Sequence, residues 1–150
     1  LKKLPYFFIQ MEAECKEMEQ TVIREHKHVI VRAYVNNPPS NSEHLSSWCR
    51  EVITSVGMKC IGGPLVVHSD MEGNAGYTAV AVLDFSHLAI HSWDEISPAL
   101  IEFDLFSCKN FDIDLVLTKL NEFGIVSYST LVVDRDDFDN QQRPLLRNVA

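Results

Sequence analysis

The side chains that could take part in a reaction lie in one continuous stretch of the sequence and at one cysteine that follows it. The stretch is Phe85-Ser86-His87-Leu88-Ala89-Ile90-His91-Ser92-Trp93-Asp94-Glu95, and Cys108 follows at the end of the next apolar run. A serine just ahead of a strand can be held with its hydroxyl against the preceding carbonyl, where positioning supplies much of a reaction's rate. A thiol with an ordinary pKa of about 8.5 is a neutral proton donor near pH 7.

Each of these residues also has a purely structural interpretation. Ser86 is compatible with an ordinary strand start, and His87 and His91 with satisfied surface or core histidines. Cys108 alone is typical of a small buried hydrophobic residue, and Glu95 alone of a solvated carboxylate. Trp48 and Trp93 are most simply core aromatics. Only the combination of these residues at this spacing favours a chemical function.

The elements that position these residues are predicted from hydrophobic periodicity. Period-2 apolar segments predict strands, and 3-, 4- and 7-residue spacing with a polar start and a terminal glycine predicts helices. The expected strands are 28–35, 58–68, 77–83, 86–93, 99–108 and 125–133, and the expected helices are 43–56, with Ser42 as N-cap, and 112–123.

The order β-α-β-β-β-β-α-β predicts an α+β fold, a two-layer sandwich with an antiparallel-rich sheet and helices on one face. The other face then needs cover from a partner or from the N-terminal segment. Residues 1–26 are expected to be a helical N-terminal extension, residues 27–135 the main domain, and residues 136–150 a loose tail.

Strand parity constrains the site. Cys108 shares a side of its strand with Glu102 and Asp104, so a polar site on that side is plausible. Ser86 and His91 are five positions apart, which is roughly 16–17 Å in a regular strand. Either the strand bends at Ser86, or His91 serves the Ser86 of a partner chain.

Composition excludes several classes of protein. The chain has 150 residues and a net charge of −8, and an acidic surface argues against nucleic-acid binding. No apolar run approaches the ~18 residues of a membrane span. The four cysteines form no CxxC pair, so we expect no metal site and a reducing, cytoplasmic setting.

The stretch from Ser86 to Cys108 resembles the prokaryotic type of S-adenosylmethionine decarboxylase. That family has the run Glu-Ser-His-Leu-Thr-Ile-His-Thr-Trp-Pro-Glu, followed by an apolar strand that ends in Phe-Thr-Cys. The chain matches the core Ser-His-x-x-Ile-His-x-Trp-x-Glu and ends the next strand with Phe106-Ser107-Cys108. The family's early Lys/Arg-His-apolar strand resembles the run that begins at Lys27-His28.

The resemblance implies a proenzyme that cleaves itself and makes its own cofactor. Ser86 is the residue that the family converts to a pyruvoyl group, after attack on the carbonyl of Phe85. The pyruvoyl ketone forms a Schiff base with the substrate amine and drives decarboxylation, a reaction of polyamine (spermidine) synthesis. The resemblance also implies a homodimer that needs no metal.

The same resemblance assigns roles to four further residues. His91 assists processing, Thr78 occupies the place of a second processing hydroxyl, Cys108 donates a proton to the carbanion, and Glu95 matches a carboxylate that holds the substrate ribose.

The chain departs from the family pattern at four places. Phe85 replaces the family's Glu, Asp94 replaces its Pro, and the segment before Cys108 is longer by two residues around Ile96-Ser97. The loop at residues 69–76 lacks the family's adenine-stacking aromatic. Two alternatives therefore stay open: a relative that acts on another amino acid or amine, and an unprocessed, non-catalytic relative that binds or regulates a partner.

Overall fold

The computed structural model describes residues 25–136 and 145–149. The helix predicted within the N-terminal extension lies outside these residues. The described strands are β1 (Lys27–Val35), β2 (Cys60–Ser69), β3 (Gly76–Leu83), β4 (Ser86–Trp93), β5 (Ala99–Ser107), β6 (Ile125–Asp134) and β7 (Leu145–Val149). The helices are α2 (Ser42–Ser55), α3 (Ile113–Leu120) and a short 3₁₀ turn, η1 (Asn121–Phe123).

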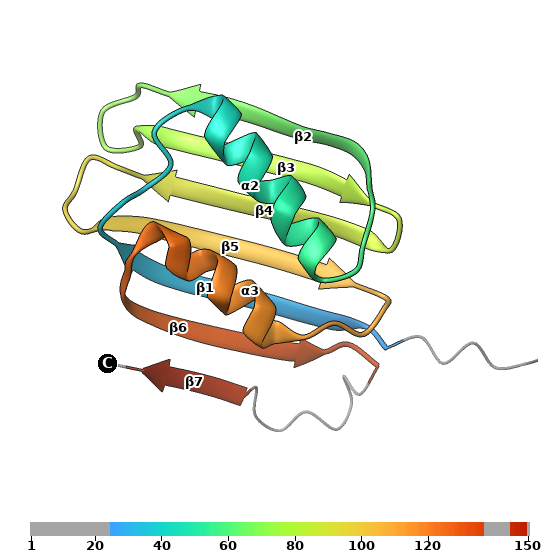
Figure 1. Cartoon of the computed structure of the whole chain (residues 1–150). Helices are drawn as coiled ribbons and strands as arrows, with labels where there is room; N and C mark the ends of the chain where they lie inside the picture. Colours follow the sequence, from blue (N-terminus) through green and yellow to red (C-terminus); the bar gives the residue numbers. More distant parts are fainter. Residues whose placement is uncertain (1–24, 137–144, 150) are drawn as a thin grey trace, which may run out of the picture.

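The strands form one antiparallel sheet in the order β2-β3-β4-β5-β1-β6-β7, and both helices lie on the same face of it (Figure 1). This confirms the predicted two-layer α+β sandwich. β4 and β5, which hold the candidate residues, lie near the middle of the sheet, so their backbone groups are paired on both sides.

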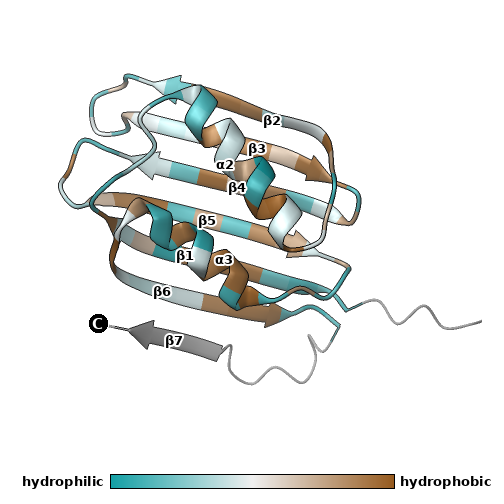
Figure 2. Ribbon diagram, viewed as in Figure 1, coloured by the Kyte–Doolittle hydropathy of each residue, from teal (hydrophilic) through white to brown (hydrophobic). Residues whose placement is uncertain are grey.

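The core lies between the sheet and the two helices. Along β4 and β5, buried residues alternate with more exposed ones, so only every second side chain turns toward the helices. Figure 2 shows hydrophobic segments in both strands. The side chain of Phe103 on β5 packs edge-on against Trp48 of α2, with ring centroids 6.0 Å apart. The largest fully buried side chains include Phe103, Phe123, Leu45, Ile53, Leu88, Ile90, Ile101 and Leu105.

The two helices begin at side-chain caps. Asn41, rather than the predicted Ser42, caps α2, because its side chain accepts a hydrogen bond from the N–H of His44. Asp112 caps α3 in the same way.

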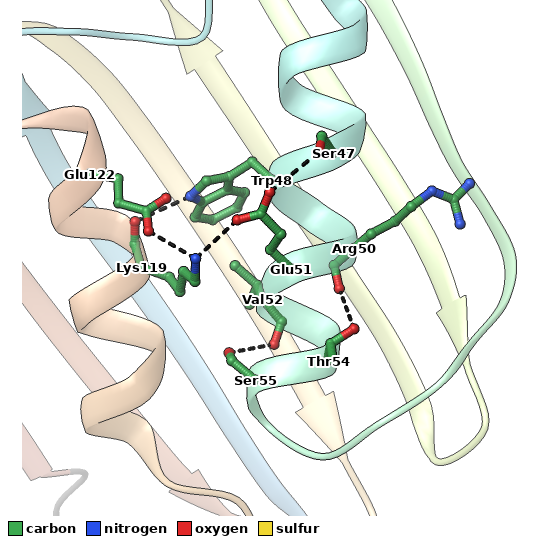
Figure 3. Close-up of polar contacts among 9 residues, drawn as sticks. All are labelled: Ser47, Trp48, Arg50, Glu51, Val52, Thr54, Ser55, Lys119 and Glu122. Carbon is green, nitrogen blue, oxygen red and sulfur yellow. Dashed lines mark hydrogen bonds and ion pairs between the residues drawn. The ribbon is translucent and has the colours of Figure 1, made fainter.

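A polar contact also joins the helices on their outer side (Figure 3). Lys119 lies between the carboxylates of Glu51 and Glu122, at 3.0 and 2.8 Å, and Trp48 donates its indole N–H to the Lys119 carbonyl. The Lys119 ammonium holds the pKa of the Glu51 carboxyl below its usual range.

The C-terminal residues correct one prediction. Residues 136–150 were expected to be a loose tail, but Leu145–Val149 form β7, which pairs antiparallel with β6 from Tyr128 to Val132. The outer edge of β6 offers unpaired N–H and C=O groups that an extended segment can satisfy. The sequence pattern misses this strand because it is short and follows a polar, proline-containing segment.

No described helix or strand covers the opposite face of the sheet, which we call the open face. Its edge at β2 and β3 is apolar: Leu65 is 68% exposed, and Val67, Val80 and Val82 are also exposed. The middle of the open face is more polar, with His28 and Arg32 of β1, Thr78 of β3, His87 and His91 of β4, and Glu102 and Asp104 of β5. Within the described residues, no helix is long and apolar enough to cross a bilayer.

Candidate functional site

The candidate residues fall into two groups, one at each end of β4. Strand β4 stays in register with β3 and β5 at all eight positions from Ser86 to Trp93. Ser86 and His91 therefore remain five positions apart, roughly 16–17 Å along the strand. No bend brings them together within one chain.

The first group surrounds the peptide bond between Phe85 and Ser86. The Phe85 carbonyl oxygen accepts two hydrogen bonds from Cys108, one from its backbone N–H at 3.1 Å and one from its thiol at 3.2 Å. Two donors on one carbonyl oxygen are the arrangement that stabilises negative charge during acyl transfer. Cys108 is thus placed against the bond that the sequence singled out.

Ser86 itself has an unusual backbone. Its φ of 158° is the only positive value at a non-glycine residue among the described residues. The serine ends the two-residue turn between β3 and β4 and begins β4 opposite Leu83 and Ser107. Its hydroxyl lies 3.2 Å from Nδ1 of His87, a contact that the sequence analysis did not anticipate.

The second group occupies a pocket of about 320 Å³ at the other end of β4. Thr78 and His91 are register partners on β3 and β4, and the threonine hydroxyl lies 3.0 Å from Nδ1 of His91. The His91 ring stacks on Trp93 with centroids 5.7 Å apart. Trp93 was expected in the core, but it is only half-buried and lines this pocket, because its parity places it on the open face.

The Glu95 carboxylate holds the neighbouring loop. One oxygen accepts the N–H of Gly73 at 2.9 Å and the other accepts the N–H of Ala75 at 3.2 Å. Trp93 donates its indole N–H to Asn74 of the same loop at 2.8 Å. The loop at residues 69–76 is therefore tied to the end of β4, beside Thr78 and His91.

The cysteines differ in environment. Cys49 is fully buried in the core, and burial raises the pKa of its thiol to about 12, with a smaller contribution from Cys60. Cys108 is only half-buried and has a carbonyl acceptor. Among the described residues, no group of three or more His, Cys, Asp or Glu side chains is arranged to hold a metal ion.

Comparisons with known proteins agree with this geometry. A family model described as S-adenosylmethionine decarboxylase matches residues 27–136. The adenosylmethionine decarboxylase of Aquifex aeolicus has a similar structure, with a TM-score of 0.60 and 19% identity over 75% of this chain and 91% of that one. At this identity the likeness shows the fold. No curated protein sequence matches the chain.

Proposed function

Because the chain belongs to the S-adenosylmethionine decarboxylase family, we propose that it is a self-processing, pyruvoyl-dependent decarboxylase of S-adenosylmethionine. One observation supports this most directly. The carbonyl that must be attacked, that of Phe85, already accepts two hydrogen bonds from Cys108, and the attacking hydroxyl belongs to the next residue, Ser86.

The first step is an acyl shift within the chain. The Ser86 hydroxyl oxygen bonds to the carbonyl carbon of Phe85, and the hydroxyl proton passes to a base. The two donors of Cys108 stabilise the negative charge on the Phe85 oxygen. The carbon–nitrogen bond then breaks and the nitrogen takes up a proton, which leaves an ester and a free amine at Ser86.

The later steps divide the chain in two. Loss of the Ser86 Cα proton expels the ester oxygen as the C-terminal carboxylate of Phe85 and leaves a double bond in residue 86. Water then replaces the nitrogen, ammonia leaves, and the new N-terminus is a pyruvoyl group. This pyruvoyl group, which is formed from residue 86, supplies the electron-withdrawing ketone for loss of carbon dioxide, as in other enzymes that use a carbonyl cofactor.

Cys108 fits the role of proton donor in the decarboxylation. Its thiol already hydrogen-bonds to the carbonyl adjoining residue 86, so it lies beside the position where the substrate must react. Once Phe85 becomes a free carboxylate, the thiol is released from that carbonyl and is available to protonate the substrate carbon.

We propose a homodimer in which the open faces of two copies meet. Ser86 and the Thr78–His91 pair lie at opposite ends of β4. A twofold axis that lies between the two open faces and runs perpendicular to β4, level with its middle, therefore brings the Ser86 end of one copy toward the His91 end of its partner. Leu65, Val67, Val80 and Val82 give this face apolar surface that favours burial.

The pocket beside His91 suits a small aromatic substrate. Trp93 offers a ring face, which compensates for the missing aromatic in the loop at residues 69–76. Glu95 is a candidate for holding the ribose hydroxyls, after release from Gly73 or Ala75.

A second candidate function is that of a relative that acts on another amine substrate. Phe85, which replaces a glutamate of the family, favours it, and the Phe85 ring lies 5.4 Å from the Lys109 ammonium.

Substrate trapping tests the proposed activity. Incubation of the cleaved protein with S-adenosylmethionine and cyanoborohydride is expected to add the mass of the reduced, decarboxylated substrate to the fragment that begins at residue 86. A cleaved protein that gains no mass from S-adenosylmethionine, but gains mass from another amino acid, would support the second candidate. The variant Ser86→Ala, which has no carbonyl to trap the amine, is the control.

A further inference from the structure

We propose that His87 is the base that activates Ser86 within its own chain, and that Asp104 and His28 hold it in place. The inference rests on the proposed self-cleavage and assigns its first proton transfer. The contact that suggests it is the 3.2 Å separation between the Ser86 hydroxyl and Nδ1 of His87.

The second nitrogen of the same ring faces a carboxylate. Nε2 of His87 lies 3.5 Å from Oδ1 of Asp104, and the other oxygen of Asp104 lies 2.6 Å from Nε2 of His28. A hydroxyl, an imidazole and a carboxylate in this order form the arrangement by which a serine is activated as a nucleophile in other enzymes. Here a second imidazole extends it.

The register of three strands explains why these side chains meet. Phe106 of β5 is paired with His87 of β4 on one side and with His28 of β1 on the other. Its ring contacts both imidazoles at centroid distances of 5.8 Å. Asp104 lies two residues from Phe106 on the same face, so its two oxygens reach both rings.

His91 is poorly placed to act as this base in a single chain. It lies at the far end of β4, where it contacts Thr78 and Trp93. If His87 takes the Ser86 proton, His91 of a partner copy is left for the steps that follow ester formation. His87 would then act first, on the serine of its own chain, and His91 would act later, on the serine of the partner chain.

The proton movements balance. Nδ1 of His87 takes the Ser86 hydroxyl proton as the oxygen bonds to the Phe85 carbonyl carbon. The Asp104 carboxylate stabilises the imidazolium that forms. When the carbon–nitrogen bond breaks, the imidazolium returns the proton to the departing nitrogen, and His87 is neutral again at the ester stage.

Groups from three neighbouring strands surround His87. Asp104 faces it from β5, His28 lies beyond that carboxylate on β1, and β3 presents the uncharged Val82 opposite it. Arg135 lies over the Phe106 ring, 4.3 Å from its centroid. Asp104 is therefore an anionic group that contacts the His87 ring, and its removal should slow cleavage.

The test measures the first-order cleavage rate of freshly refolded full-length protein on denaturing gels. His87→Asn should lower the rate by about 100-fold or more, the usual effect of losing a general base. Hydroxylamine should release fragment from it correspondingly slowly, because ester formation is the step that is slowed, and imidazole should restore part of the rate of His87→Gly. His44→Asn, at an exposed position on α2, is the matched control.

Mixed dimers test whether His87 acts in its own chain. Co-expression of His87→Asn with Ser86→Ala should restore no cleavage, because the one intact serine lacks its neighbouring base. Asp104→Asn should slow cleavage, and Asp104→Glu, which restores a carboxylate, should recover part of the rate. His87 is 49% exposed, so its loss should leave the fold intact, and thermal unfolding of each variant checks this.

The outcomes separate this inference from the proposed function. A wild-type chain that never cleaves overturns both. A cleaving wild type with His87→Asn at the same rate overturns only the assignment of His87. Cleavage in the His87→Asn and Ser86→Ala mixture overturns the action within one chain, and an unchanged cleavage rate in Asp104→Asn overturns the role of Asp104.

Discussion

Cys108 donates both its backbone N–H and its thiol to the carbonyl oxygen of Phe85, at 3.1 and 3.2 Å. The two residues are 23 positions apart, yet the pairing of β4 with β5 places the turn before one strand beside the end of the other. In the proposed mechanism, the same thiol polarises the Phe85 carbonyl before cleavage and donates a proton to the substrate carbon after it. The proposed enzyme depends on this contact in both stages.

Cys108→Ala should slow self-cleavage by about tenfold or more, because one of two donors to the developing oxyanion is lost while the backbone N–H remains. The measurement is the decay of the full-length band with time. Cys60→Ala, which removes a thiol on β2 that donates to the carbonyls of Gly62 and Gly63, is the control. Equal rates for the two variants would contradict a role for the Cys108 thiol in processing.

Ser86→Ala and His91→Ala should each fail to cleave alone but cleave in part when co-expressed, since the mixed dimer contains one Ser86 facing an intact His91. The two chains need different affinity tags so that the mixed dimer is purified before the gel. If the mixed dimer stays at full length while the wild type cleaves, His91 does not serve the serine of a partner.

Glu95→Ala should release the loop at residues 69–76, because the amides of Gly73 and Ala75 lose their common acceptor. Hydrogen exchange at these amides should become faster, while exchange in β4 stays unchanged. The cleaved variant should also have a higher KM for the substrate. Asp94→Ala, at the neighbouring exposed position, is the control, and unchanged exchange in Glu95→Ala would argue against the link.

Cys49 should make stability sensitive to alkaline pH. Burial raises its thiol pKa from 9.0 to about 12, so the folded state holds the proton that the unfolded state releases. This contribution is complete below pH 9 and is lost as pH rises from 9 toward 12. The fall in unfolding midpoint between pH 8 and pH 11 should be smaller for Cys49→Ala than for the wild type; an equal fall would contradict the assignment.

The sequence predicts most of the fold because local patterns determine it. Strand β4 occupies the predicted residues 86–93, and the helix predicted at 43–56 is α2, which buries Leu45, Trp48 and Ile53. The strand order, with β1 between β5 and β6, depends on long-range pairing that no local pattern encodes. Strand β7 depends likewise on the free edge of β6.

The site is less predictable than the fold. Parity alone places Asp104 and Cys108 on one side of β5, but contact of Asp104 with His87 and His28 requires knowing which strands flank β5. The hydrogen bonds of Glu95 to the loop amides are also invisible in the sequence, because they join two loops. The one available signal for His87 was its position directly after Ser86.

Intact-mass analysis of the purified chain tests the central claim most directly. The proposed chemistry predicts two fragments, one ending at Phe85 with a free carboxylate and one beginning at residue 86, whose mass is lower than that of the serine-initiated peptide because a pyruvoyl group replaces the serine. Ser86→Ala should stay whole under the same conditions. A wild-type chain that remains whole, with an unmodified Ser86 after prolonged incubation, would contradict self-cleavage and favour the non-catalytic alternative.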